Sequence, residues 1–217
     1  MIIYNPNDED IIKERIEETQ KILDSIPAKY CFISGSFLFK KDYRDIDIFI
    51  ISRTKKEIKV INKKINIIRI DFNDIYSLFY HSASKSCIAK NILPKKPLKV
   101  TIADYWDVIN EAVPTVLNEK DKYHKNIRFL VLYTEYLKNN QILDTYELRR
   151  KIEKFKNFGE ILEYIKQEIP LIINKQAKKS YIKRYFYTQA GYYKDSIDYK
   201  SQKYLYELSH NIVKGVA

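Results

Sequence analysis

The first half of the chain alternates polar and apolar residues in short runs. In residues 45–52, and again in residues 66–72, every second side chain is apolar, which predicts two strands. A third apolar run, 30–34, ends at Gly35, as a strand does before a turn. Residues 8–26 instead repeat apolar positions every three or four residues, so we predict a helix there. These elements indicate an α/β domain.

From residue 123 onward the apolar spacing is helical throughout. Five amphipathic segments follow one another, and they cover residues 125–139, 145–156, 158–174, 177–193 and 200–214. Pro170 is predicted to kink or end the third of them. We therefore expect an α+β protein in which residues 1–120 form the α/β domain and residues 121–217 form a helical bundle.

Weaker patterns lie between these regions. A helix is predicted to begin near Asp74 and to run into a polar loop at 82–86. A short strand is predicted at 98–102, followed by a helix at 104–112. These segments complete the expected α/β domain.

Composition is that of an ordinary globular protein. Of the 217 residues, 45% are hydrophobic and 31% are charged, and no apolar run approaches the roughly 18 residues of a membrane-spanning helix. The first residues lack the basic and apolar segments of a secretion signal. Two cysteines, Cys31 and Cys87, are too few for a disulfide framework or a cysteine-built zinc site. We therefore expect a cytoplasmic protein with reduced thiols and no membrane partner.

The chain is basic, with a formal net charge of +11, and the charge is concentrated in its second half. Residues 121–217 carry 19 Lys and Arg against 11 Asp and Glu, a net charge of +8. Aromatic rings that can stack on bases, next to cations that can bind phosphates, are typical of RNA-binding surfaces. Tyrosines at helical spacing are instead typical of a bundle core. Rings and cations are interleaved between residues 181 and 206, where they are Tyr181, Lys183, Arg184, Tyr185, Phe186, Tyr187, Tyr192, Tyr193, Lys194, Tyr199, Lys200, Lys203, Tyr204 and Tyr206.

Three carboxylates carry the candidate chemistry. Asp45 and Asp47 are two positions apart on a predicted strand, so both side chains leave the same face, about 7 Å apart. Asp71 lies on the next predicted strand. If the two strands are neighbours, the three acids converge, and Mg²⁺ or Mn²⁺ would neutralise them. Two such cations about 4 Å apart would clamp a phosphoryl group during in-line displacement.

A turn that is suited to phosphate precedes these acids. Gly35 and Ser36 directly follow the predicted strand 30–34. A glycine lets the backbone approach a phosphate closely, and the following amides and the Ser36 hydroxyl can donate to phosphate oxygens. The sequence therefore predicts a triphosphate cradle beside a two-metal site.

Together these motifs resemble the signature of the DNA-polymerase-β-type nucleotidyltransferase superfamily, and the resemblance covers about residues 8–75. The residues that carry it are, in order, Ser34-Gly35-Ser36, Asp45-Ile46-Asp47 and Asp71. It implies a mixed-sheet nucleotidyltransferase fold, to which the C-terminal helical bundle is appended.

The resemblance also implies roles for these residues. Asp45 and Asp47 would bind both Mg²⁺ ions, and Asp71 would bind one of them and help to deprotonate the acceptor hydroxyl. Ser34, Gly35 and Ser36 would hold the nucleotide phosphates. The implied reaction is template-independent transfer of a nucleoside monophosphate from an NTP, ATP included, to a hydroxyl group, with release of pyrophosphate.

The acceptor is left open by the sequence. RNA, tRNA in particular, is suggested by the basic, tyrosine-rich second half. A partner protein, as in antitoxin-like nucleotidyltransferases, and a small molecule such as an aminoglycoside are the alternatives. Two readings without catalysis also stand: a nucleotide-binding module that has lost turnover, and a basic RNA-binding protein whose acids are incidental.

Overall fold

A computed structural model describes residues 1–53, 64–192 and 198–216, with only the backbone described for residues 187–192. The chain forms two compact units. The first contains residues 1–99 together with Ile142–Leu148, and the second contains residues 100–141 and the chain from Arg149 onward. The described residues form a mixed sheet and helices, so the α+β class predicted from the sequence is confirmed.

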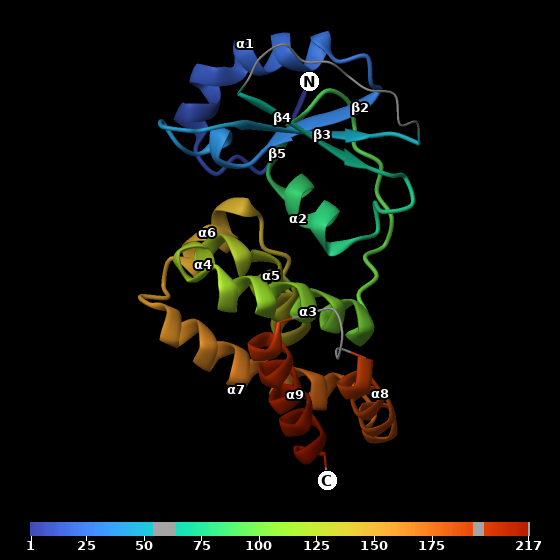
Figure 1. Cartoon of the computed structure of the whole chain (residues 1–217). Helices are drawn as coiled ribbons and strands as arrows, with labels where there is room; N and C mark the ends of the chain where they lie inside the picture. The colour runs from blue at the N-terminus through green and yellow to red at the C-terminus, as the bar shows by residue number, and fades with distance from the viewer. Residues whose placement is uncertain (54–63, 193–197, 217) are drawn as a thin grey trace. The chain divides into compact units, whose positions relative to one another are not determined.

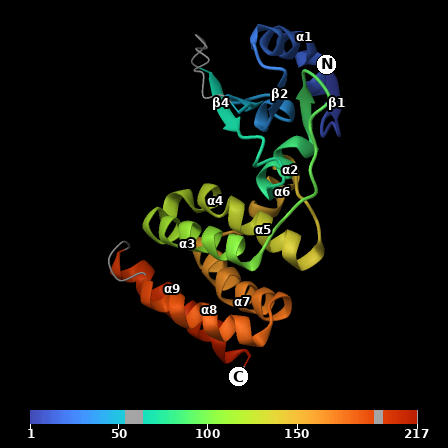
Figure 2. The ribbon, with the colours of Figure 1, turned by 90° about the vertical axis from the view of Figure 1, so that its right-hand side faces the viewer.

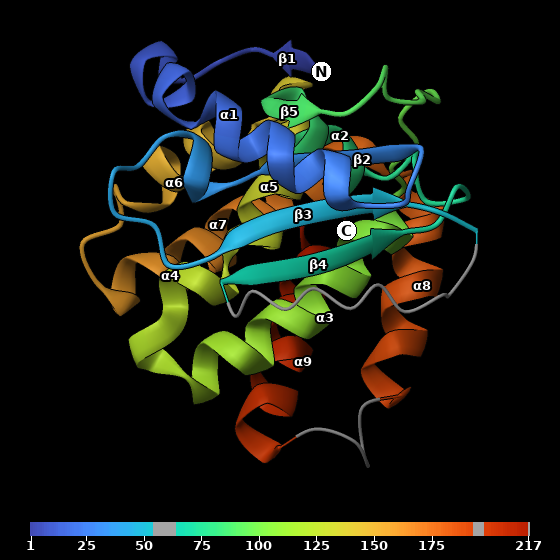
Figure 3. The same cartoon turned by 90° about the horizontal axis from the view of Figure 1, so that it is seen from above.

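The sheet of the first unit has the order β1-β5-β2-β3-β4 among the described residues. β3 and β4 are parallel, and the other neighbouring strands are antiparallel; Figure 3 shows β3 and β4 side by side with their arrows in the same direction. The strands are β1 (Ile2–Tyr4), β2 (Tyr30–Ser34), β3 (Ile46–Ile51), β4 (Ile65–Ile70) and β5 (Cys87–Ala89).

A helix covers each face of this sheet (Figure 1). α1 (Glu9–Ser25) packs through Ile12 and Leu23 on one face, where Ile46, Ile48 and Ile50 of β3 are buried. On the other face, α2 (Leu78–Lys85) packs against the alternate side chains of β3, Phe49 among them. The strict alternation of β3 therefore fixes which of its polar residues lie on the α2 face.

Some elements differ from the sequence prediction. β1 and β5 are three residues each, too short for an alternation to be visible, and they were not predicted. The predicted strand at 98–102 is wrong, because Thr101 instead caps α3 (Ile102–Asn118) through a reciprocal capping box with Asp104. α2 begins at Leu78 rather than near Asp74, and the Ser77 side chain caps it.

The second unit is helical (Figure 2). Trp106 of α3, fully buried, meets Phe186 edge to face at 4.7 Å and anchors its core. Besides α3, its helices are α4 (Tyr123–Asn126), α5 (Arg128–Asn139), α6 (Thr145–Ile152, whose first turn belongs to the first unit), α7 (Phe158–Gln176), α8 (Lys179–Tyr192) and α9 (Tyr199–Lys214).

The sequence predicts that Pro170 kinks or ends its helix; α7 continues through Pro170, so the helix does not end there. A proline inside a helix removes one backbone hydrogen bond and costs about 3 kcal/mol. Ile165, Ile169, Ile172 and Ile173 are buried on both sides of it, and their burial in the bundle core offsets that cost. None of the described helices is both long and apolar enough to cross a membrane.

Candidate functional site

The turn after β2 places the backbone against a carboxylate. Gly35 has a φ of 90°, a left-handed conformation that residues with a Cβ rarely adopt. A Cβ at this position would lie 2.9 Å from Oδ2 of Asp47, closer than such atoms approach without a shift. Glycine is therefore required both by the conformation and by the neighbouring carboxylate. The Gly-Ser turn and the Asp-Ile-Asp motif thus meet at one corner of the sheet.

Asp47 lies in the middle of a polar row across three strands. It pairs with Ser34 of β2 and with Asn66 of β4. Because paired residues point to the same face, all three side chains lie on the face that α2 covers. Nδ2 of Asn66 donates a hydrogen bond of 2.8 Å to Oδ1 of Asp47. One oxygen of Asp47 is thus held by an amide, and the other lies against the Gly35 turn.

Asp45 precedes β3 and completes a pair of carboxylates. Continuing the alternation of β3 backward places Asp45 and Asp47 on one face, about 7 Å apart. Oδ2 of Asp45 lies 3.2 Å from Nη2 of Arg44, whose side chain is 89% exposed. An ion pair as exposed as this one contributes about 0–1 kcal/mol to stability. Replacing Arg44 by a bound cation as the partner of Asp45 would therefore cost little.

The third predicted acid, Asp71, lies elsewhere. It follows the last residue of β4, which pairs with the last residue of β3, whereas Asp47 lies near the start of β3 (Figure 3). Asp71 is therefore five positions beyond Asp47 along the parallel strands, about 16 Å away. Its Oδ1 accepts a hydrogen bond of 2.7 Å from the backbone N–H of Asn73, so it stabilises the turn after β4. Asp45 and Asp47 therefore lie two positions apart at the start of β3, and the structure does not bring Asp71 to them.

Side-chain alternation separates Asp71 from the site as well. Ile65 and Ile67 pack on the α1 side of the sheet, and Ile68 and Ile70 pack on the α2 side. By the same alternation, the side chain of Asp71 lies on the α1 side, with Ile65 and Ile67. The residue that faces Asp47 from β4 is an amide, Asn66, which sequence reasoning did not single out. An amide donates to a carboxylate but is neither an anion nor a base at neutral pH.

The two serines beside Gly35 have different roles. Ser34 is 2% exposed, and its Oγ donates a hydrogen bond of 3.0 Å to the carbonyl of Ser86. Ser34 therefore anchors the start of the turn and does not present its hydroxyl outward. Ser36 is partly exposed and begins the short 3₁₀ helix Ser36–Leu38. Of the two predicted hydroxyls, that of Ser36 is the one placed to meet a ligand.

Arg15 of α1 holds the segment that links the turn to the acids, and sequence reasoning missed it. Its guanidinium donates to the backbone carbonyls of Phe37, Lys40 and Lys41, the last two at 2.6 and 2.9 Å. It also stacks on the rings of Phe37 and Tyr43, at 4.7 and 4.5 Å. Because these carbonyls occupy the donors, Arg15 fixes the segment and is not a phosphate ligand. A lone arginine in a helix gives no sequence signal of such a role.

The two carboxylates at this corner can supply only part of the coordination of a divalent cation. Among the described residues, no group of three or more His, Cys, Asp or Glu has the geometry of a metal cage. Mg²⁺ is usually bound by one or two carboxylates and completed by substrate phosphates and water. Asp45 and Asp47 supply two carboxylates, and Gly35 leaves the space beside Asp47 that a Cβ would fill. Two carboxylates are enough protein ligands for one cation bound by both of them, whereas the predicted pair of cations would need more.

The cysteines and His81 do not join this corner. Burial raises the pKa of the Cys31 thiol to about 11 and also raises the pKa of Cys87, so both stay protonated at neutral pH. Burial lowers the pKa of His81, and its Nε2 lies 3.0 Å from the carbonyl of Lys96. These side chains are structural.

The tyrosine-rich segment divides between core and surface. Phe186 is 1% exposed against Trp106, and Tyr204 is half-buried and donates its hydroxyl to the carbonyl of Leu162. Tyr199 and Tyr206 of α9 are 79% and 56% exposed. The described rings therefore include both core and surface positions, and RNA contact stays a prediction.

Some residues of that segment are outside the described part of the chain. Tyr193 and Lys194 are not described, and neither are the side chains of Tyr187 and Tyr192.

Comparison with protein-family models, with curated proteins and with solved structures finds no match for this chain. The site is therefore interpreted from its own geometry.

We predict that Gly35→Ala lowers the free energy of unfolding by about 1–3 kcal/mol, because Ala is strained at this φ and its Cβ meets Asp47. Urea denaturation measures the change. Gly159→Ala in the first turn of α7 is the matched control: φ there is not positive, and the new Cβ meets only the Asn157 side chain, at 3.1 Å. An equal or smaller loss for Gly35→Ala than for Gly159→Ala would contradict the constraint.

Proposed function

We propose that the chain is a Mg²⁺-dependent nucleotidyltransferase of the DNA-polymerase-β type, with its NTP site at the corner formed by Gly35, Ser36, Asp45 and Asp47. The observation that carries the proposal is the close approach of the Gly35 backbone to the Asp47 carboxylate, where an added Cβ would lie 2.9 Å from Oδ2. It joins a phosphate-binding turn to a pair of cation ligands, which is what binding of a metal–triphosphate requires.

Each residue has a distinct task in this proposal. The amides after Gly35 and the hydroxyl of Ser36 donate to phosphate oxygens. Asp45 and Asp47 hold the cation, and Asn66 orients Asp47 through its 2.8 Å hydrogen bond. When bound, Mg²⁺ would offset the charge of the triphosphate and stabilise the departing pyrophosphate. The acceptor oxygen bonds to the α-phosphorus, the bond to the bridging oxygen breaks, and the hydroxyl proton passes to water.

RNA is the acceptor that the second half of the chain favours. Residues 121–217 carry a net charge of +8. The exposed stripe of α9 presents Tyr199, Lys203, Tyr206 and His210 at helical spacing, and the rings of Tyr206 and His210 lie parallel with centroids 6.3 Å apart. Exposed rings beside cations suit unstacked bases and phosphates. A partner protein or a small molecule as acceptor would appear as a different labelled product.

A second candidate function is nucleotide binding without turnover, and Asn66 favours it. The β4 neighbour of Asp47 carries an amide where a third carboxylate would serve as ligand and base. Such a site retains affinity for Mg²⁺·NTP and lacks a group that takes the acceptor proton. Calorimetry with Mg²⁺·ATP, followed by an acceptor screen, separates binding with transfer from binding alone.

We predict that Asp47→Asn lowers transfer of label from α-labelled NTP by at least about 100-fold, since even outer partners of metal ligands cost 10–100-fold. The variant is isosteric and keeps an oxygen for Asn66, so the fold is preserved. The assay contains Mg²⁺ and a cell extract, and digestion by RNase or protease identifies the acceptor. Asp74→Asn, an exposed acid, is the matched control. Equal labelling by wild type and Asp47→Asn would rule out the transferase.

We predict that Asn66→Asp raises Mn²⁺ affinity about tenfold, because it places a third carboxylate beside Asp47. Without a cation the same change replaces a hydrogen bond by repulsion, so the melting temperature falls and Mn²⁺ restores it. Titration calorimetry and thermal denaturation measure the two effects. Asn73→Asp, which adds the same charge beside Asp71, should leave Mn²⁺ affinity unchanged; an equal gain there would show that the effect is nonspecific.

A further inference from the structure

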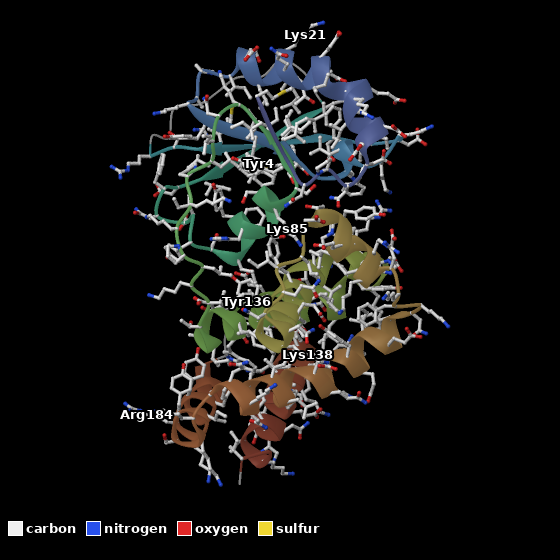
Figure 4. The ribbon with its side chains drawn as sticks, turned by 180° about the vertical axis from the view of Figure 1, so that it is seen from behind. Tyr4, Lys21, Lys85, Tyr136, Lys138 and Arg184 are labelled. Atoms are coloured by element: carbon white, nitrogen blue, oxygen red, sulfur yellow. The ribbon has the colours of Figure 1, made fainter. Side chains whose placement is uncertain are left out.

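The segment Ile142–Leu148 belongs to the first unit, although the sequence places it within the helical half. Nζ of Lys85, at the end of α2, donates a hydrogen bond of 2.8 Å to the carbonyl of Ile142 (Figure 4 labels Lys85). Oγ of Ser82 donates one of 2.6 Å to the carbonyl of Leu143. The segment is thus attached to α2 through its backbone.

Asp144 connects this segment to the start of the chain. Its Oδ1 accepts a hydrogen bond from the N–H of Glu147, and Oε2 of Glu147 accepts one from the N–H of Asp144, so Asp144 caps α6. Oδ2 of Asp144, 3% exposed as a residue, accepts a bond of 3.2 Å from Nδ2 of Asn7, 137 positions earlier. The same Nδ2 donates to Oγ of Ser86 at 2.7 Å.

Ser86 carries the connection to the Gly35 turn. Its carbonyl accepts the 3.0 Å hydrogen bond from Oγ of Ser34, the residue immediately before Gly35. Hydrogen bonds therefore link Asp144 to Asn7 and Asn7 to the Ser86 side chain, and the backbone carbonyl of Ser86 links it to the base of the turn. Each of these bonds contributes about 1 kcal/mol.

The segment also contacts the other end of the turn. The ring of Tyr146 meets the ring of Phe39 edge to face, with centroids 5.2 Å apart. Phe39 follows the 3₁₀ helix directly, and its N–H donates to the carbonyl of Ser36 at 3.2 Å. Residues 142–148 thus hold the turn from both ends, through Ser34 before it and through Phe39 after it.

We propose that the segment Ile142–Leu148 is a brace for the triphosphate-binding turn, with Asp144 and Tyr146 as positioning residues. Its role in nucleotide binding rests on the function proposed above. A turn that presents backbone amides to a phosphate group binds it more tightly when it is held in the binding conformation beforehand. The brace supplies this order from a part of the sequence that carries no phosphate ligand itself.

The test uses Asp144→Asn in the full chain. Asn caps a helix as well as Asp does, so α6 and the fold are kept. With the Asn oxygen occupied by the cap, its NH₂ group meets the NH₂ group of Asn7, and two donors cannot bond to each other. We expect the amides of Leu38, Phe39 and Lys40, whose hydrogen bonds close the turn, to exchange with deuterium about fivefold faster. The dissociation constant of Mg²⁺·ATP should rise about fivefold.

Asp198→Asn is the matched control. Asp198 also caps a helix, α9, and also accepts a hydrogen bond from an asparagine, Asn118, at 2.8 Å, but in the second unit. It should change neither the exchange of the three turn amides nor the binding of Mg²⁺·ATP. Tyr146→Leu tests the other end of the brace and should speed exchange at Phe39 and Lys40.

The two readouts separate the two proposals. Unchanged exchange of the turn amides in Asp144→Asn, or an equal change in Asp198→Asn, overturns the brace whatever the nucleotide data show. Faster exchange with an unchanged dissociation constant overturns its positioning role. A wild-type chain that binds no Mg²⁺·ATP overturns the proposed function and with it that role, while the exchange data still decide whether the segment braces the turn.

Discussion

The approach of the Gly35 backbone to the Asp47 carboxylate is the constraint on which the site depends. The chain turns at Gly35 between β2 and β3, and the residue there must lack a side chain, because a Cβ would lie 2.9 Å from Oδ2 of Asp47. Arg15 then holds the returning segment through three carbonyls and two rings. The buried isoleucines of β3 keep Asp47 on the opposite face. Backbone amides and a carboxylate are thereby fixed side by side.

Electrostatics at this corner explains what the site can bind. Asp47 is partly compensated by the Asn66 amide, and Asp45 by an exposed arginine. In the function proposed above, these two carboxylates would bind one hard cation together with phosphate oxygens. The distance of Asp71 from this pair removes the expected third ligand. A transferase must deprotonate the acceptor hydroxyl without this third carboxylate, whereas a binding module has no need to.

The sequence predicted the parts of this site that depend on local pattern. The alternation of residues 45–52 and the glycine after the run 30–34 were sufficient to place β3, the turn and the side-chain face of Asp47. Which residue of β4 faces Asp47 depends on the register between two strands, and a period-2 pattern does not fix register along a parallel pair. Asn66 was missed and Asp71 chosen for that reason.

Long-range contacts account for the other elements that the sequence did not reveal. β1 is stabilised by pairing with β5, and β5 by pairing with β1 and β2, not by a pattern of their own. The sequence predicted residues 145–156 as one more bundle helix, and it did not reveal that residues 142–148 belong to the first unit, because their contacts with Asn7, Ser82 and Lys85 leave no periodic signal.

Paramagnetic broadening by Mn²⁺·ATP in the ¹⁵N-labelled chain tests the central claim most directly. The account predicts that the amide signals of Gly35, Ser36 and Asp47 broaden most and that the signal of Asn73, beside Asp71, broadens far less. Broadening that is strongest at Asn73, or equal throughout the chain, would contradict a nucleotide–cation site at the Gly35 turn.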